Sequence, residues 1–125
     1  IEHVAKQEKM VKECHRILKK GGVLYLSFPP YYSIKGGHYL SPLHYLPGNL
    51  PERIYASLHP SMQKPYDLYR TSIRSVQRMV KGMFRVGDIS PRVFSFLKPI
   101  AKIPLLNEIM IHHIEFVLYK RRKLK

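Results

Sequence analysis

The sequence has one cysteine, few acidic residues and no long apolar run. A single cysteine, Cys14, among 125 residues excludes a framework of internal disulfides and favours a reducing compartment. No apolar run is long enough to span a bilayer. The first six residues lack an initiator methionine and do not have the pattern of a signal peptide. We therefore expect a cytoplasmic protein in which Ile1 is an internal residue of a longer chain.

Short motifs for metal binding and for nucleophilic hydrolysis are also missing. There is no CxxC or HExxH pair of ligands and no GxSxG turn around a serine. His112 and His113 are adjacent in a predicted strand, so their side chains point to opposite faces and cannot share one ion. The Gly36-Gly37 pair does not fit the GxGxxG or P-loop patterns. The sequence therefore predicts no metal site, and we interpret Cys14 as a small core residue.

The shortage of acidic residues leaves a strongly basic chain. Twenty-two Lys and Arg stand against eight Asp and Glu, which gives a formal net charge of +14. Such a charge attracts nucleic acid, anionic lipid or phosphorylated substrates. The alternative is that an acidic part of a longer chain balances it. Arg70, Arg74 and Arg78 lie on one face of a predicted helix, and nine tyrosines could stack on bases, but no RNP, KH or zinc-finger pattern is present.

The rest of the composition is that of a folded domain. Hydrophobic residues make up 45% and charged residues 24% of the chain, which is typical of globular proteins. A chain of 125 residues buries one ordinary core. We therefore expect at most one domain.

The first third of the chain predicts a helix followed by a buried strand. Between residues 5 and 19, apolar residues recur at helical spacing along one face; they are Met10, Val11, Cys14, Ile17 and Leu18. Gly21 is expected in the left-handed conformation after the helix. Residues 23–28 are nearly all apolar, so we expect a strand with both faces covered, as in a parallel sheet. Pro29 and Pro30 end that strand, and its carboxyl end is where open α/β sheets bind ligands.

The remaining segments alternate between loops and regular elements. Residues 31–65 are rich in proline and tyrosine, and we expect a lid-like insertion with a short helix opening at Asn49. Periodicity predicts a helix over 67–81, with Tyr69, Ile73, Val76 and Val80 as its apolar stripe. We then expect a strand over 84–96 with a bend near Gly87 or Pro91, a short helix over 100–108, and a final strand over 111–119. The basic residues 120–123 are expected to form a solvated tail.

The first quarter of the chain carries a family resemblance. Ile1-Glu2-His3-Val4 is followed by a helix and then by Leu18-Lys19-Lys20-Gly21-Gly22-Val23-Leu24-Tyr25-Leu26-Ser27. This order resembles the "EHV…LKPGG.L.ISxP" segment of class I S-adenosylmethionine (SAM)-dependent methyltransferases of the type 11 group. Lys20 stands where that group usually has proline.

The resemblance implies an α/β fold, the C-terminal half of a Rossmann-like methyltransferase. Residues 23–28 would be the fifth strand of a seven-stranded sheet, with helices packed on the sheet. Residues 84–96 and 111–119 would form its antiparallel edge pair. The glycine-rich SAM loop and the acidic residue for the ribose would lie upstream, so residues 1–125 would be a partial methyltransferase domain.

The resemblance also implies where the site lies. Glu2 and His3 would follow the fourth strand, beside the bound SAM and the methyl acceptor. His3 or His38 would serve as the base if the acceptor is a hydroxyl or an amine, although His3 could instead only bond backbone at the end of a strand. The residues expected on the acceptor side are Pro29, Tyr31, Tyr32, Gly37 and His38.

Two functions from different classes follow from these observations. The first is part of a SAM-dependent methyltransferase that acts on a small-molecule or lipid-linked acceptor and is inactive without the missing N-terminal half. The alternative is a non-enzymatic basic module that binds nucleic acid or an anionic membrane surface. A lipid-linked acceptor or an anionic membrane surface would place the protein at the periphery of a membrane.

Overall fold

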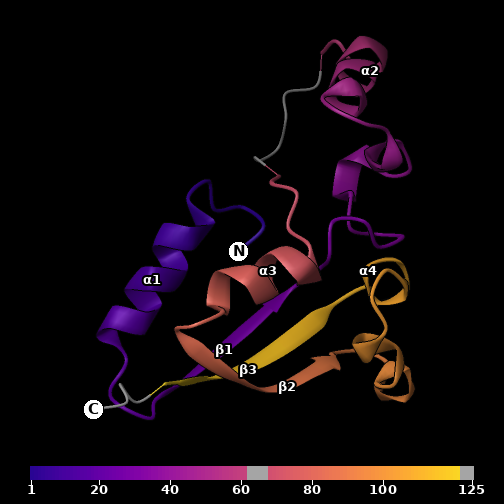
Figure 1. Cartoon of the computed structure of the whole chain (residues 1–125). Coiled ribbons are helices and arrows are strands. Elements are labelled where there is room, and N and C mark those ends of the chain that lie inside the picture. Colours follow the sequence, from indigo (N-terminus) through magenta and orange to yellow (C-terminus); the bar gives the residue numbers. More distant parts are fainter. Residues whose placement is uncertain (62–67, 122–125) are drawn as a thin grey trace.

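The computed structural model describes residues 1–61 and 68–121 (Figure 1). It contains short helices and three strands in one α/β unit. The helices are α1 (Gln7–Ile17), α2 (Leu50–Leu58), α3 (Ile73–Val80) and α4 (Leu106–Met110). The strands are β1 (Val23–Phe28), β2 (Phe84–Pro91) and β3 (Ile114–Lys120), and four short 3₁₀ turns lie between these elements.

The three strands form one sheet in the order β1-β3-β2. Both pairings are antiparallel, and Phe116 of β3 lies opposite Leu26 of β1 and Ile89 of β2. The expected antiparallel pair is therefore present as β2 and β3, and β3 also pairs with β1 on its other side. No parallel pairing occurs among the described residues, so the structure shows an antiparallel α/β unit and not the expected Rossmann-like parallel arrangement.

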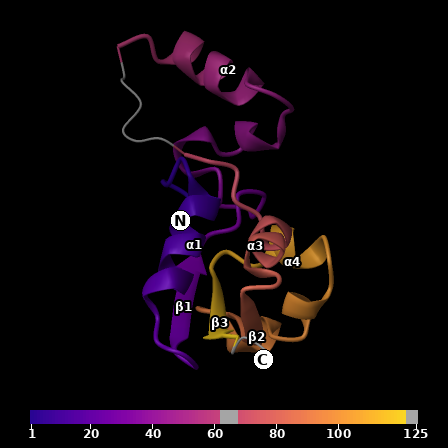
Figure 2. The same ribbon diagram turned by 60° about the vertical axis from the view of Figure 1, so that its left-hand side comes forward.

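One face of this sheet carries the core. Leu26, Phe28 and Phe116 point to this face and pack with Val11 of α1 and Val76 of α3. Both helices lie on the same side of the sheet (Figures 1 and 2). The predicted alternation in the last strand is confirmed, because its inward residues are fully buried while its outward residues are half-exposed.

The opposite face of the sheet is largely uncovered. Val23 and Tyr25 of β1 are 49% and 57% exposed, and Val117 of β3 is half-buried. The expectation that β1 has both faces covered is therefore wrong for the described residues. In the described part of the chain β1 also has a free edge, on the side away from β3.

Helix α1 is shorter than the spacing predicts. It begins at Gln7 and ends at Ile17, and the Ile17 side chain is 65% exposed although it belongs to the predicted apolar face. Gly21 has the expected left-handed φ of +74°. It lies in the turn that joins α1 to β1, closed by a bond from the Gly22 amide to the Lys19 carbonyl, and is not the cap of the helix itself.

Helix α3 also starts later than predicted. Ser72 is its N-cap, because its hydroxyl accepts from the Ser75 amide and the Ser75 hydroxyl accepts from the Ser72 amide. The Glu108 carboxylate also accepts from the first two amides of α3. The predicted apolar residues Ile73, Val76 and Val80 are all buried.

The predicted arginine ladder is therefore incomplete. Arg74 and Arg78 are exposed on α3, but Arg70 precedes the helix. The Arg70 guanidinium donates to the Gly48 carbonyl and lies 5.3 Å from the centre of the Tyr31 ring. Asp67, the predicted start of this helix, lies outside the described residues.

The segment from Tyr31 to Ser61 folds on itself beside the sheet. It contains 3₁₀ turns at His38–Leu40 and Leu43–Tyr45, followed by α2, which begins after Asn49 as predicted. Helix α2 lies well away from the strands (Figures 1 and 2). The lid role expected for 31–65 stays a prediction, and residues 62–65 lie outside the described part.

The segment between β2 and β3 differs most from the predictions. The bend at Gly87 is confirmed as a register shift between Val86 and Asp88, but the strand ends at Pro91 and not at residue 96. The helix expected over 100–108 is wrong. A 3₁₀ turn covers Ile100–Lys102 and α4 begins at Leu106, because Pro104 has no amide to donate within a continuous helix and Leu105 has a φ of +72°.

Candidate functional site

The candidate site lies where the first residues of the chain meet the loop after β1. The Glu2 carbonyl accepts from the Tyr69 amide at 2.8 Å, which fixes the start of the chain beside the segment that leads into α3. The Gln7 side-chain amide donates to the Thr71 hydroxyl at 2.6 Å. The Thr71 carbonyl in turn accepts from the Tyr31 amide at 2.8 Å. The fully buried Thr71 therefore joins the two arms of the site, which are the first residues of the chain and the loop after β1.

Two glycines shape the loop that carries His38. A Cβ on Gly36 would overlap the Pro30 carbonyl oxygen and lie 2.6 Å from that of Tyr31, and a Cβ on Gly37 would overlap the buried His44 ring. The glycines thus permit close packing, whereas the residue with a positive φ in this turn is His38 itself, at +49°. The loop reverses next to His38, and the left-handed conformation belongs to the histidine and not to either glycine.

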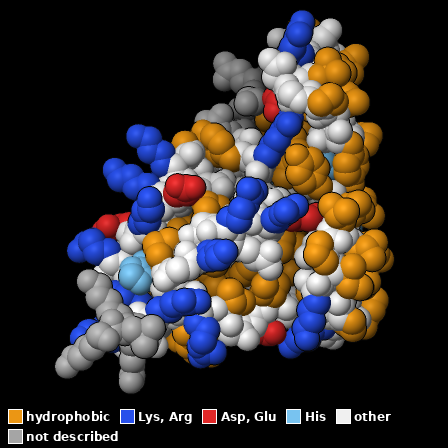
Figure 3. Space-filling model, viewed as in Figure 1, with side chains coloured by type: hydrophobic (Ala, Val, Ile, Leu, Met, Phe, Trp, Pro, Cys, Tyr) orange, Lys and Arg blue, Asp and Glu red, His pale blue; other side chains and the backbone are white. Residues whose placement is uncertain are grey.

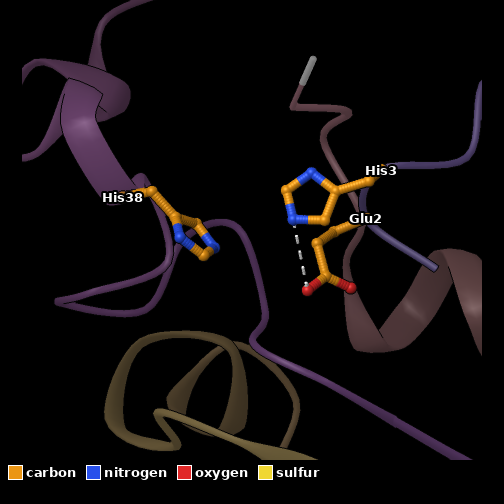
Figure 4. A group of neighbouring side chains, drawn as sticks. All are labelled: Glu2, His3 and His38. Atoms are coloured by element: carbon orange, nitrogen blue, oxygen red, sulfur yellow. Dashed lines mark ion pairs between the residues drawn. The ribbon is translucent and has the colours of Figure 1, made fainter. Parts of the chain in front are cut away.

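Glu2, His3 and His38 converge across the space between these arms (Figure 4). The His3 Nε2 lies 3.8 Å from the Glu2 Oε1. The His3 and His38 ring centres are 5.9 Å apart, edge to face. One nitrogen or oxygen atom from each of the three residues lies within 4.8 Å of the others. The structure therefore brings together the two histidines that the sequence singles out as candidate bases.

The Glu2 carboxylate is partly buried beside the more exposed His3 ring. The side chain is 16% exposed, while that of His3 is 44% exposed. The cluster thus offers an anionic oxygen and an accessible imidazole on one side of the loop.

The other predicted acceptor residues lie around this cluster in different surroundings. Pro29 is half-buried at the end of β1. Tyr31 is 2% exposed and packs edge-on against Tyr32 and His44, so in this structure it is a packing residue of the loop. Tyr32 is 39% exposed. It faces a cavity of about 960 Å³ between α3, β2 and α4, away from Glu2 and His3.

The buried His44 was not predicted from the sequence. It is fully buried, and its Nε2 lies 3.1 Å from the Ser33 carbonyl oxygen, so that it closes the loop from inside. Burial lowers the pKa of His44 from its usual value near 6.5. The only signal in the sequence is the pair of glycines seven and eight residues before it, which alone does not indicate a ring packed against a backbone.

The lowered pKa of His44 predicts a pH dependence of stability. Below pH 6.5 the unfolded chain binds a proton at this residue more readily than the folded chain does, so the free energy of unfolding falls as the pH drops from 7 to 5.5. One group contributes at most about 1.4 kcal/mol per pH unit. Urea unfolding measured between pH 7 and 5.5 is expected to show that the free energy of unfolding of the His44→Gln variant changes less with pH than that of the wild type. The exposed His59→Gln variant is the control. The same pH dependence of the free energy of unfolding in all three proteins would contradict this role for His44.

Helices that could cross a membrane are not found in the described part of the chain, since none there is both long and apolar enough.

Comparison with known proteins gives a distant methyltransferase relative. No family model matches the chain. The chain is 27% identical over 124 residues to an uncharacterized methyltransferase of Mycobacteroides abscessus. The match covers 96% of this chain and 48% of that protein, so the chain spans about half the length of this relative. The α/β unit is consistent with part of a methyltransferase fold, and the likeness supports a methyltransferase.

Proposed function

We propose that the chain is the C-terminal part of a class I, type 11-like SAM-dependent methyltransferase that acts on a small-molecule or lipid-linked acceptor. The observation that carries this proposal is the match to a methyltransferase over nearly the whole chain but only half of that protein. The geometry supports it further, because Glu2 and His3 lie beside the loop that follows β1. In an open α/β sheet this end of a strand is where ligands bind.

The uncovered part of the sheet supports a missing partner segment. An edge strand that exposes apolar residues favours association with another chain, and β1 exposes Val23 and Tyr25 beside its free edge. In the complete protein, residues that precede this chain would extend the sheet at β1 and cover its open face. The excess positive charge would then be balanced in part by that segment.

The proposed cofactor, SAM, supplies an electrophilic methyl group on a sulfonium. The described residues do not form a full cradle for it, because β1 is followed by Pro29 and Pro30 and a 3₁₀ turn and not by a glycine-rich turn into a helix. The cradle would come from the preceding residues. This chain would supply the acceptor side, where Glu2 orients His3, and the His3 or His38 imidazole takes a proton from a hydroxyl or amine acceptor.

Calorimetric titration with SAM tests this proposal. The chain would be expressed alone and together with the residues that precede it in its gene. We expect the longer protein to bind SAM and the chain alone to show no binding heat. A longer protein that is folded, as shown by circular dichroism, and does not bind SAM would contradict the proposal.

A second candidate function rests on the apolar surface of the segment that connects β2 to β3 in the sequence. Eight large hydrophobic residues within residues 93–110 are more than 40% exposed; they are Val93, Phe94, Phe96, Ile103, Leu105, Leu106, Ile109 and Met110. Apolar side chains gather over the α4 region in the space-filling view (Figure 3). Lys98 and Lys102 are exposed within the same segment. Apolar residues interspersed with lysines are typical of a surface that binds anionic membranes.

Vesicle co-sedimentation tests this second candidate. We expect the protein to bind vesicles that contain anionic lipid more strongly than neutral vesicles, and the Phe96→Ser/Leu105→Ser double variant to lose most of this binding. The Ile17→Ser variant, at an exposed residue on α1, is the matched control. Binding that depends on the charge of the lipid but is unchanged in the double variant would argue against the apolar surface as the binding site. A preference for duplex nucleic acid over vesicles would favour the nucleic-acid alternative.

A further inference from the structure

We propose that Glu2, His3 and His38 form a binding site for a divalent transition-metal ion such as Zn²⁺. Glu2 and His3 are adjacent at the start of the sequence, and the fold brings the distant His38 next to them (Figure 4). Among the residues that the structure describes, this is the group of histidine and carboxylate side chains whose ligand atoms converge to within 4.8 Å. The site requires neither SAM nor methyl transfer.

The distances are close to those of a metal centre. Tetrahedral Zn²⁺ holds nitrogen and oxygen ligands at about 2.0–2.1 Å, which places the ligand atoms roughly 3.3 Å from each other. The Glu2 Oε1 and the His3 Nε2 are already 3.8 Å apart. The other pairs of ligand atoms lie within 4.8 Å, so they must approach by up to about 1.5 Å to bind one ion. Because the His3 side chain is 44% exposed, its ring can turn toward an ion without displacing core atoms.

The donor set has the chemistry of a catalytic metal site. Two imidazoles and one carboxylate suit Zn²⁺ and other first-row ions, and three protein ligands leave at least one position open for water or substrate. The Glu2 carboxylate is partly buried, with its side chain 16% exposed, and lies beside the His3 imidazole. The His38 ring, with its centre 5.9 Å from that of His3 and edge to face with it, adds a second imidazole to the Glu2–His3 ion pair.

The backbone around the cluster fixes the ligands in advance. The Tyr69 amide holds the Glu2 carbonyl on one arm. On the other arm, Gly36 and Gly37 pack so closely that no side chain fits, and His38 is held at a φ of +49°, which non-glycine residues adopt rarely. Strained backbone at a residue with a ligating side chain is typical of functional sites. If the proposed methyltransferase function holds, a bound ion would replace the free His3 or His38 imidazole as the group that acts on the acceptor, and the open position would take the oxygen of the acceptor.

Zn²⁺ titration of the protein, purified without a histidine tag and competed against a chromophoric chelator, tests the site. We expect one ion to bind per chain. Each of His3→Ala, Glu2→Gln and His38→Asn is expected to weaken binding at least tenfold, and His38→Asn keeps a residue that tolerates the left-handed conformation. The exposed His59→Ala, outside the cluster, is the matched control and should leave the affinity unchanged.

His3→Ala is the decisive variant, because His3 is the most exposed ligand and its removal should not disturb folding. Circular dichroism identifies any variant that is unfolded, and Co²⁺ substitution gives a second readout, with visible absorption bands in the wild type that each ligand variant alters. Equal Zn²⁺ affinity in the wild type, His3→Ala and His59→Ala would overturn the proposal, as would the absence of binding to the wild type. Because no SAM is present, this failure is distinct from failure of the methyltransferase proposal.

Discussion

The Phe116→Ala variant is expected to lose about 3–5 kcal/mol of the free energy of unfolding. Phe116 is fully buried in β3, the central strand, and lies opposite Leu26 and Ile89 on the two neighbouring strands. Its ring stacks on that of Phe28 with the centres 5.9 Å apart. Truncation would therefore open a cavity that all three strands line, and domains of this kind are stable by only about 5–15 kcal/mol in total.

The matched control is Val117→Ala, one residue along the same strand. Val117 points to the uncovered face of the sheet and is half-buried, so we expect its truncation to remove roughly 1 kcal/mol. Urea denaturation of the two variants measures the difference. Equal destabilisation by the two substitutions would contradict the assignment of one buried and one open face.

The Gly36→Ala variant is expected to destabilise the protein by about 3 kcal/mol and to disrupt the candidate site. A Cβ at this position would overlap the Pro30 carbonyl oxygen and lie 2.6 Å from that of Tyr31. Both atoms belong to the backbone at the end of β1, so neither can swing aside as a side chain would. The loop must move away from the strand, and His38 would move with it.

Gly48→Ala separates this steric effect from backbone strain. Gly48 has a φ of +63° and open space around it, so an alanine there meets only the penalty of the left-handed conformation, about 1–2 kcal/mol. We expect Gly36→Ala to lose more stability than Gly48→Ala, and only Gly36→Ala to weaken Zn²⁺ binding. The reverse order in a denaturation experiment would contradict the close packing of the loop.

Elements with strong local patterns could be predicted from the sequence. Strand β1 is found where its apolar run predicts, and the alternation of Ile114, Phe116 and Leu118 correctly gives the buried face of β3. Both signals are local, because burial on one face imposes a period of two on a strand. The expected covering of both faces of β1 failed for the described residues, since what covers a face depends on other elements.

Segments governed by tertiary contacts were predicted less well. The helix over 67–81 starts late because the Tyr69 amide is bonded to Glu2 and Thr71 accepts from Tyr31, which keeps this stretch extended. Likewise, Pro104 and Leu105 split the helix expected over 100–108. Local periodicity carries no information about such partners.

The candidate site was predicted as a set of residues but not as an arrangement. The family resemblance pointed to Glu2, His3 and His38, and these three side chains do converge. Neither the short ligand motifs nor the His112-His113 pair indicates a metal site in the sequence. A ligand set split between the start of the chain and a loop after β1 has no regular spacing, so only the fold reveals it.

Methyl transfer by the complete protein tests the central claim most directly. The protein, with the residues that precede this chain in its gene, would be incubated with SAM labelled on its methyl group and an extract of small molecules and lipids from its host. The account predicts labelled product in the organic or aqueous extract, and a loss of at least tenfold in the His3→Ala or the His38→Asn variant but not in His59→Asn. A folded, SAM-binding protein that transfers no label, or full activity in both the His3→Ala and the His38→Asn variants, would contradict it.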